Sequence, residues 1–172
     1  RFPCGRAAHS ALDGERTDLL ASLGDMHALL VNAAPVWTTE AREHDRIARD
    51  YYRAAIARRP SYPYTWANLA VVKFRLVELD LEFLTALERA TTLGPWEPEI
   101  QKTVTDLGLA AWPVLPEASR AQVRDNIERG MRGQGETMVR LALHHRRTEV
   151  IAPLVQGNER LETILKAGAA SG

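Results

Sequence analysis

The sequence predicts an all-α fold of stacked antiparallel helix pairs, and three observations point to it. Apolar residues recur at spacings of three and four, which is the period of one helix face. Glycine and proline interrupt the chain roughly every 15 to 20 residues, a length typical of single helices. Ala (25) and Leu (21) outnumber Val (11) and Ile (6), and unbranched side chains lose less rotamer freedom in a helix.

The first two helices have clear boundaries. The first is expected over 13–31, with its leucines on one side, and a loop containing Pro35 follows it. Thr38 or Thr39 can cap the second helix, expected over 40–58, because a hydroxyl accepts a hydrogen bond from an N–H group that the first turn leaves unpaired.

Proline and aspartate open the next three helices. Pro63 suits the first position of a helix, where its missing N–H would have no partner anyway. Asp80 caps the following helix, and Pro98 opens another. These helices are expected over 63–77, 81–93 and 98–111.

Turn residues divide the C-terminal part. A turn at Pro113 and Pro116 precedes the sixth helix, and Gly133 and Gly135 break the chain before the seventh. The helices are expected over 117–131, 136–146 and, as one or two short pieces, within 149–166. Residues 1–11 show no pattern, so we expect a flexible N-terminal segment at 1–11 and a single helical-repeat domain at 12–172.

Composition excludes several classes of protein. The 22 basic and 22 acidic residues give a net charge of zero, which removes the usual basis for nucleic-acid binding. The single cysteine, Cys4, permits neither an internal disulfide framework nor a cysteine zinc site. No apolar run approaches the 18 or so residues of a membrane span. Because the chain begins with Arg1, we expect a processed form or a fragment of a longer protein.

An internal repeat with spacing 4-3-5 runs through the chain. Its three copies are Ala48, Tyr52, Ala55 and Pro60; Phe83, Leu87, Ala90 and Pro95; and Val123, Ile127, Gly130 and Gly135. Small residues at fixed intervals let one helix approach another closely, and the last residue of each copy ends the helix.

The first copy resembles the second helix of the tetratricopeptide repeat family, Ala-x3-aromatic-x2-Ala-x4-Pro. Trp66, Leu69 and Ala70 then match the opening of that family's next helix. Phe83 stands where the family has a small residue, and Gln101 where it has an aromatic one. The resemblance therefore implies a degenerate, right-handed array of helix pairs.

The resemblance also implies a partner-binding groove lined by the first helix of each pair. The expected groove residues are Tyr64, Asn68, Val71, Phe74, Arg75, Lys102 and Asp106. Asn68 stands where peptide-binding members place an asparagine toward the ligand backbone. The basic residues of the carboxylate-gripping members are absent, so we expect a mixed, apolar groove that takes a helix or an extended segment of a partner protein.

A second resemblance involves a stretch rich in proline and tryptophan. Residues 93–99 (LGPWEPE), followed by 106–109 (DLGL) and Trp112, resemble accessory proteins of bacterial exopolysaccharide biosynthesis, of the VpsP type. This resemblance implies a non-catalytic scaffold in polysaccharide biosynthesis or export. It also implies a bacterial, envelope-associated or periplasmic location, with the cytoplasm as the alternative. A second copy of the chain is a further expected partner, since a helical array can bury the face of a terminal helix by dimerising.

The Arg-rich region 120–147 supports an alternative function. Arg120, Arg124 and Arg132 could bind an anionic glycan or a lipid headgroup, although a solvated helix face with internal ion pairs also fits. Catalysis is not expected. No histidine pair has the i, i+4 metal-ligand spacing, no phosphate loop is present, and Glu43-His44-Asp45 reads as an exposed face. We therefore expect no catalytic residue, no metal and no cofactor.

Overall fold

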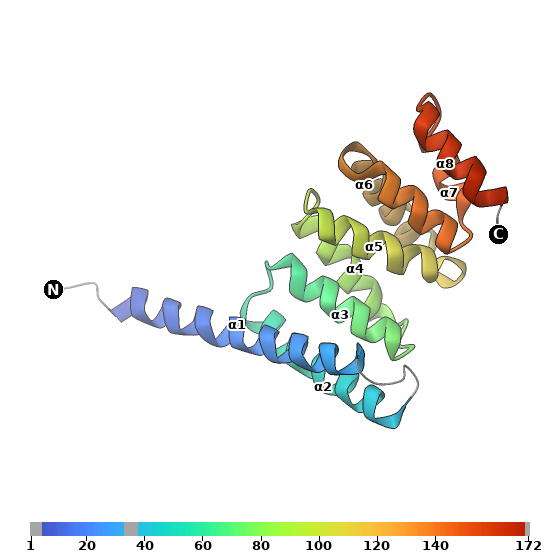
Figure 1. The fold of residues 1–172 in the computed structure, drawn as a ribbon. Coiled ribbons are helices and arrows are strands. Elements are labelled where there is room, and N and C mark those ends of the chain that lie inside the picture. Colours follow the sequence, from blue (N-terminus) through green and yellow to red (C-terminus); the bar gives the residue numbers. More distant parts are fainter. Residues whose placement is uncertain (1–4, 33–37, 171–172) are drawn as a thin grey trace. The chain divides into compact units, whose positions relative to one another are not determined.

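The structure is a computed structural model that describes residues 5–32 and 38–170, with side chains described at 14–29 and 38–170. Over these residues the chain is all-α and contains no strand (Figure 1). The elements are α1 (Gly5–Asn32), α2 (Thr39–Arg58), α3 (Pro63–Arg75), α4 (Leu81–Leu93), α5 (Pro98–Ala110), η1 (Trp112–Val114), α6 (Glu117–His144), α7 (Thr148–Ile151), η2 (Ala152–Leu154) and α8 (Glu159–Ala170).

Helices that follow one another in the sequence pack as pairs. α1 packs on α2, α2 on α3, and α5 on α6. The predicted all-α class with sequential helix pairs is therefore confirmed. Contacts divide the chain into two compact units, Arg1–Ala86 and Leu87–Gly172, and the division falls within α4. The single repeat domain expected over 12–172 stays a prediction.

The predicted starts of α2, α3, α4 and α5 agree closely with the structure. Thr38, rather than Thr39, caps α2, since its Oγ1 accepts a hydrogen bond from the Ala41 N–H at 3.1 Å. The Asp80 carboxylate caps α4 by accepting from the Phe83 N–H at 3.0 Å. Pro63 and Pro98 occupy the first positions of α3 and α5, as their missing N–H groups require.

Two helices are longer than predicted. α1 begins at Gly5, inside the segment expected to be flexible; residues 1–4 lie outside the described part, and the flexibility stays a prediction. Most of the loop expected after α1, 33–37, also lies outside it. α6 continues through the expected break, but Gln134 has φ −143° and ψ 44°, so two helical parts meet in a kink between Gly133 and Gly135.

The first three positions of each repeat copy are buried. In the first copy Ala48, Tyr52 and Ala55 are at most 1% exposed. The corresponding positions of the other copies are also buried: Phe83, Leu87, Ala90, Val123, Ile127 and Gly130. A Cβ atom on Gly24 would lie 2.6 Å from Cε1 of Tyr52, so α1 can approach α2 here only because this residue has no side chain.

Lys73, near the end of α3, is fully buried, which the sequence pattern did not predict. Its Nζ donates to Glu78 at 3.1 Å, to Asp80 at 2.9 Å and to Glu82 at 2.7 Å. Burial lowers the pKa of Lys73, but these three carboxylates outweigh it and hold the pKa above its ordinary value. The odd-numbered residues of the segment 77–81 are apolar, and their side chains are exposed: Val77, Leu79 and Leu81.

The chain leaves α3 through a left-handed cap. The N–H groups of Val77 and Glu78 donate to the carbonyls of Phe74 and Lys73 at 3.0 and 2.9 Å, which is a Schellman motif. Glycine usually occupies the left-handed position, yet here it is Val77, with φ 62°. A branched side chain in this conformation is strained.

We predict that Val77→Gly stabilises the protein. It removes the left-handed strain at an exposed site, and the gain exceeds the added chain entropy of glycine, leaving about 1 kcal/mol in the free energy of unfolding. Urea denaturation checks this. Arg146, with φ 54°, is another non-glycine residue in the left-handed region, and Arg146→Gly should act in the same direction. A lower free energy of unfolding in both variants would show that the left-handed conformation is not strained at these two residues.

We also predict an acid-sensitive contribution from Glu82. A hydrogen bond from Arg53, opposed by burial and aided by Lys73, lowers the pKa of Glu82 to about 2 from 4.5. Since the pKa is lower in the folded chain, the stabilisation is complete above pH 4.5 and disappears as the pH falls toward 2. The free energy of unfolding of Glu82→Gln should therefore fall less over this range than that of the wild type.

Urea titrations between pH 2 and 7 measure this difference. Glu88→Gln, at an exposed position of the same helix, controls for the change in net charge. Parallel pH curves for Glu82→Gln and the wild type would show that the contacts with Arg53 and Lys73 contribute nothing to acid stability.

Candidate functional site

Two neighbouring pockets lie between α1 and α3 in the first unit, with volumes of about 270 and 350 Å³. The first is lined by Asp25, Ala28, Leu29, Tyr52, Asn68, Val71, Val72 and Arg75. The second is lined by Asp18, Ala21, Ser22, Asp25, Tyr62, Tyr64, Thr65 and Asn68. Because both include Asp25 and Asn68, the pockets meet at these residues, and we call them together the α1/α3 groove.

The helical period explains why these residues share one surface. On α1 the lining positions are 18, 21, 22, 25, 28 and 29, which are three or four apart along one face. On α3 the positions 64, 65, 68, 71, 72 and 75 do the same. α2 contributes only Tyr52, which is 1% exposed and lies at the base of the first pocket.

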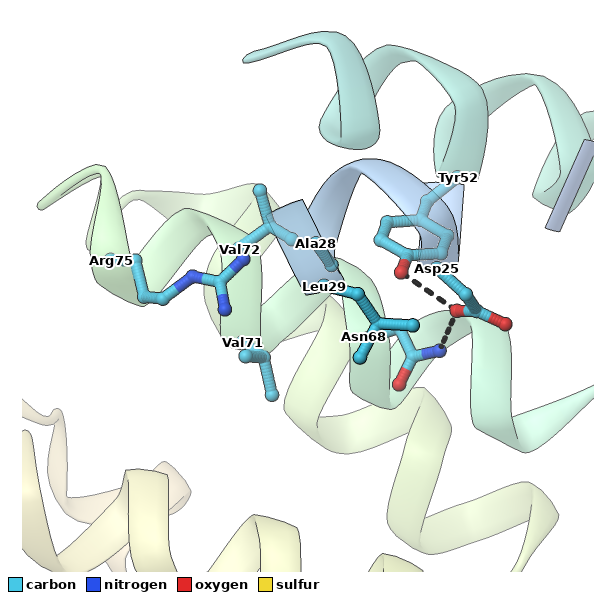
Figure 2. A pocket seen from close by; sticks show the side chains of 8 residues that line it. All are labelled: Asp25, Ala28, Leu29, Tyr52, Asn68, Val71, Val72 and Arg75. Atoms are coloured by element: carbon cyan, nitrogen blue, oxygen red, sulfur yellow. Dashed lines mark hydrogen bonds between the residues drawn. The ribbon is translucent and has the colours of Figure 1, made fainter. Parts of the chain in front are cut away.

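Asp25 joins the three helices. Its Oδ1 accepts a hydrogen bond from Oη of Tyr52 at 2.8 Å and another from Nδ2 of Asn68 at 2.9 Å, as Figure 2 shows. Burial and the hydrogen bond to Asp25 raise the pKa of Tyr52 above its ordinary value, so its hydroxyl stays a donor. The amide N–H₂ of Asn68 is thus directed to Asp25.

An ion pair lies at the end of the α1/α3 groove formed by Arg75. Nη2 of Arg75 donates to Oδ1 of Asp45, which is only 4% exposed. The expectation that Glu43-His44-Asp45 forms an exposed face is therefore wrong for Asp45, because Arg75 supplies the partner that lets its carboxylate be buried. Nε of Arg75 is buried and has no hydrogen-bond partner among the described residues.

Aromatic rings and a second ion pair form the end near Tyr62. The rings of Tyr62 and Tyr64 lie 5.4 Å apart. The guanidinium of Arg59 lies 4.6 Å from the centre of the Tyr62 ring and 3.5 Å from Oδ1 of Asp18. This end of the groove already holds one cation between an aromatic face and a carboxylate.

The predicted groove residues fall into three groups. Tyr64, Asn68, Val71 and Arg75 line the α1/α3 groove. Phe74 lines neither pocket, and its ring lies 6.4 Å from that of buried Phe83. Its expected contact with a partner stays a prediction.

Lys102 and Asp106 lie on α5, in the second unit. Nζ of Lys102 is 3.9 Å from Glu99, and Asp106 contacts Nε2 of His145 at 2.6 Å. Their part in a partner-binding groove stays a prediction.

The arginines expected to bind anions have partners within the chain. Arg124 donates to Glu117 at 2.6 Å, and the pKa of Glu117 falls below its ordinary value because of this bond. Arg120 donates to the carbonyls of Trp112 and Pro113 at 3.1 and 3.2 Å. Arg132 lies 5.8 Å from the centre of the Trp96 ring.

Sequence reasoning missed two features of the first unit. It did not place α1 in the groove, although Asp18, Asp25 and Leu29 share a helix face by their spacing alone. It also considered only histidines on one helix, whereas Nδ1 of His27 on α1 and Nδ1 of His44 on α2 lie 2.9 Å apart. No group of three or more metal-binding side chains occurs among the described residues.

No protein-family model, no curated protein and no solved structure matches the chain. What is established is an all-helical fold whose helices pack in sequential pairs, and no family is identified. In the described part of the chain, no helix combines the length and the apolar character needed to cross a membrane.

We predict that Tyr52→Phe destabilises the first unit. The change removes the hydroxyl that donates to Asp25 but keeps the buried ring, and a hydrogen bond to a charged group contributes about 1.5 kcal/mol. Urea denaturation should show this loss of free energy of unfolding. An unchanged stability would mean that water replaces the hydroxyl at Asp25 without cost.

Proposed function

We propose that this chain is a non-catalytic interaction module and that its α1/α3 groove binds a segment of a partner protein. The observation that supports this most directly is the composition of the groove. Leu29, Val71 and Val72 provide an apolar stretch beside the oriented polar groups of Asp25 and Asn68. A few polar groups that fix orientation beside apolar lining are typical of binding sites.

Binding rather than catalysis is supported by the way the polar groups of the groove pair with one another. Asp18 contacts Arg59, Arg75 contacts Asp45, and Asp25 accepts from two neutral donors. These contacts hold the helices in place. Leu29, by contrast, is 66% exposed, so a partner that covers it gains the free energy of burying its apolar surface.

The resemblance to tetratricopeptide repeats and to exopolysaccharide accessory proteins supports a scaffold role. We propose that the chain organises a protein complex of polysaccharide biosynthesis or export at the bacterial envelope. The second candidate is direct binding of an anionic glycan or lipid headgroup by Arg120, Arg124 and Arg132. It is the weaker one, because Glu117 and two backbone carbonyls already occupy the first two guanidinium groups.

We predict that Leu29→Ala combined with Val71→Ala weakens partner binding at least tenfold, which corresponds to about 1.4 kcal/mol. The loss follows from the apolar area that both side chains offer to a partner. The measurement is affinity capture from a bacterial lysate with membranes, washed at low and high salt and read by mass spectrometry.

Leu19→Ala is the matched control, since Leu19 is also on α1 and is 60% exposed but lines neither pocket. A protein held by the wild type and by Leu19→Ala at high salt, and lost from the double variant, supports the groove. If all three proteins retain the same salt-sensitive material, the groove proposal is wrong and the arginines become the better candidate.

A further inference from the structure

The charges of the α1/α3 groove are not all compensated within the chain. Asp18 has Arg59 as its partner at 3.5 Å, and Arg75 has Asp45. Asp25 accepts hydrogen bonds only from neutral donors, and no cation contacts it among the described residues. The carboxylate at the junction of the two pockets is therefore the uncompensated charge of the groove lining.

We propose that the α1/α3 groove selects a partner segment carrying a lysine or arginine side chain next to an apolar one. The basic group pairs with Asp25, and the apolar side chain packs on Leu29 and Val71. This inference rests on the proposed function and adds the chemistry of the partner. Charge complementarity argues for it, because Asp25 is a lining carboxylate that has no cationic partner among the described residues.

Asp25 is fixed in position before any partner arrives. Both hydrogen bonds fall on Oδ1, as Figure 2 shows, so Oδ2 has no partner among the described residues. The donors are the buried hydroxyl of Tyr52 and the amide of Asn68. A carboxylate that neighbouring groups already orient loses little conformational freedom when a cation binds to it.

The aromatic end of the groove is already occupied by a cation of the chain itself. Arg59 lies over the face of Tyr62 at 4.6 Å, which is the geometry of a cation–π contact. Tyr64 and Asp25 line the same pocket. Because Arg59 covers the face of Tyr62 and pairs with Asp18, the carboxylate available to a partner's basic side chain is Asp25.

The distance between Asp25 and Leu29 on α1 predicts the distance between the basic and the apolar residue of the partner. Asp25 and Leu29 are four residues apart, which is about 6 Å along the helix axis. An extended segment covers that distance in two residues, at about 3.3 Å each. The pattern expected in an extended partner is therefore basic-x-apolar, and in a helical partner the two residues are four apart.

Asp25→Asn tests the inference because the amide keeps an oxygen acceptor for Tyr52 and Asn68 but removes the charge. The full chain is used to select binders from a phage-displayed library of random 12-residue peptides. The selected peptides are synthesised, and so are versions in which the basic residue is replaced by Gln. Fluorescence anisotropy gives each Kd for the wild type, for Asp25→Asn and for Glu15→Gln, an exposed charge-matched control on α1.

We expect selected peptides to be enriched in Lys and Arg. Asp25→Asn should weaken their binding at least tenfold and Glu15→Gln less than threefold. Replacing the peptide's basic residue should cost tenfold with the wild type and almost nothing with Asp25→Asn, which isolates the pair. Far-UV circular dichroism and thermal unfolding establish that the variants are folded.

Two results distinguish the inference from the proposed function. In the first, the selected peptides lose binding to the variant with Leu29→Ala and Val71→Ala, but they show no preference for basic residues or bind Asp25→Asn as well as the wild type. This result overturns the inference and supports the groove as a binding site. If no peptide is selected, or if none depends on Leu29 and Val71, the proposed function fails and the inference fails with it.

Discussion

The first unit depends on one carboxylate oxygen. Oδ1 of Asp25 receives Tyr52 from α2 and Asn68 from α3, so three helices are joined at a single atom of α1. The contact is within reach because Gly24, one residue earlier, lets α1 lie directly against the Tyr52 ring. Close packing at Gly24 thus brings Asp25 to Tyr52, and the hydrogen bond from Asn68 connects α1 and α3, the two walls of the α1/α3 groove.

A second polar centre fixes the exit from α3. Lys73 gathers the carboxylates of Glu78, Asp80 and Glu82, and Arg53 holds Glu82 from α2. Since a buried ammonium is costly without partners, these carboxylates are directed toward Lys73, and the apolar residues between them are exposed. The strained backbone at Val77 belongs to the same arrangement, because it directs the chain back toward Lys73.

The helices were predictable because their determinants are local. A cap such as Thr38, a first-turn proline such as Pro63, and the small residues of the repeat act over one or two turns. The polar centres were not predictable. Nothing near Asp25 in the sequence indicates that Tyr52 and Asn68, 27 and 43 residues away, will meet at it. Lys73 likewise looks like any basic residue near a helix end. For Arg75 the helix face was predictable, but its partner Asp45 depended on tertiary packing.

Charged groups are paired within the chain to different degrees at the two proposed binding surfaces. A net charge of zero says only that the totals match. In the second unit, Arg124 has Glu117 as its partner and Arg120 has backbone carbonyls, so an incoming anion must compete with contacts already made. At Asp25 the neighbours orient the carboxylate without neutralising it. A cation entering there would gain an ion pair without displacing either hydrogen bond of Asp25, and this difference is why we propose the groove rather than the arginines as the binding surface.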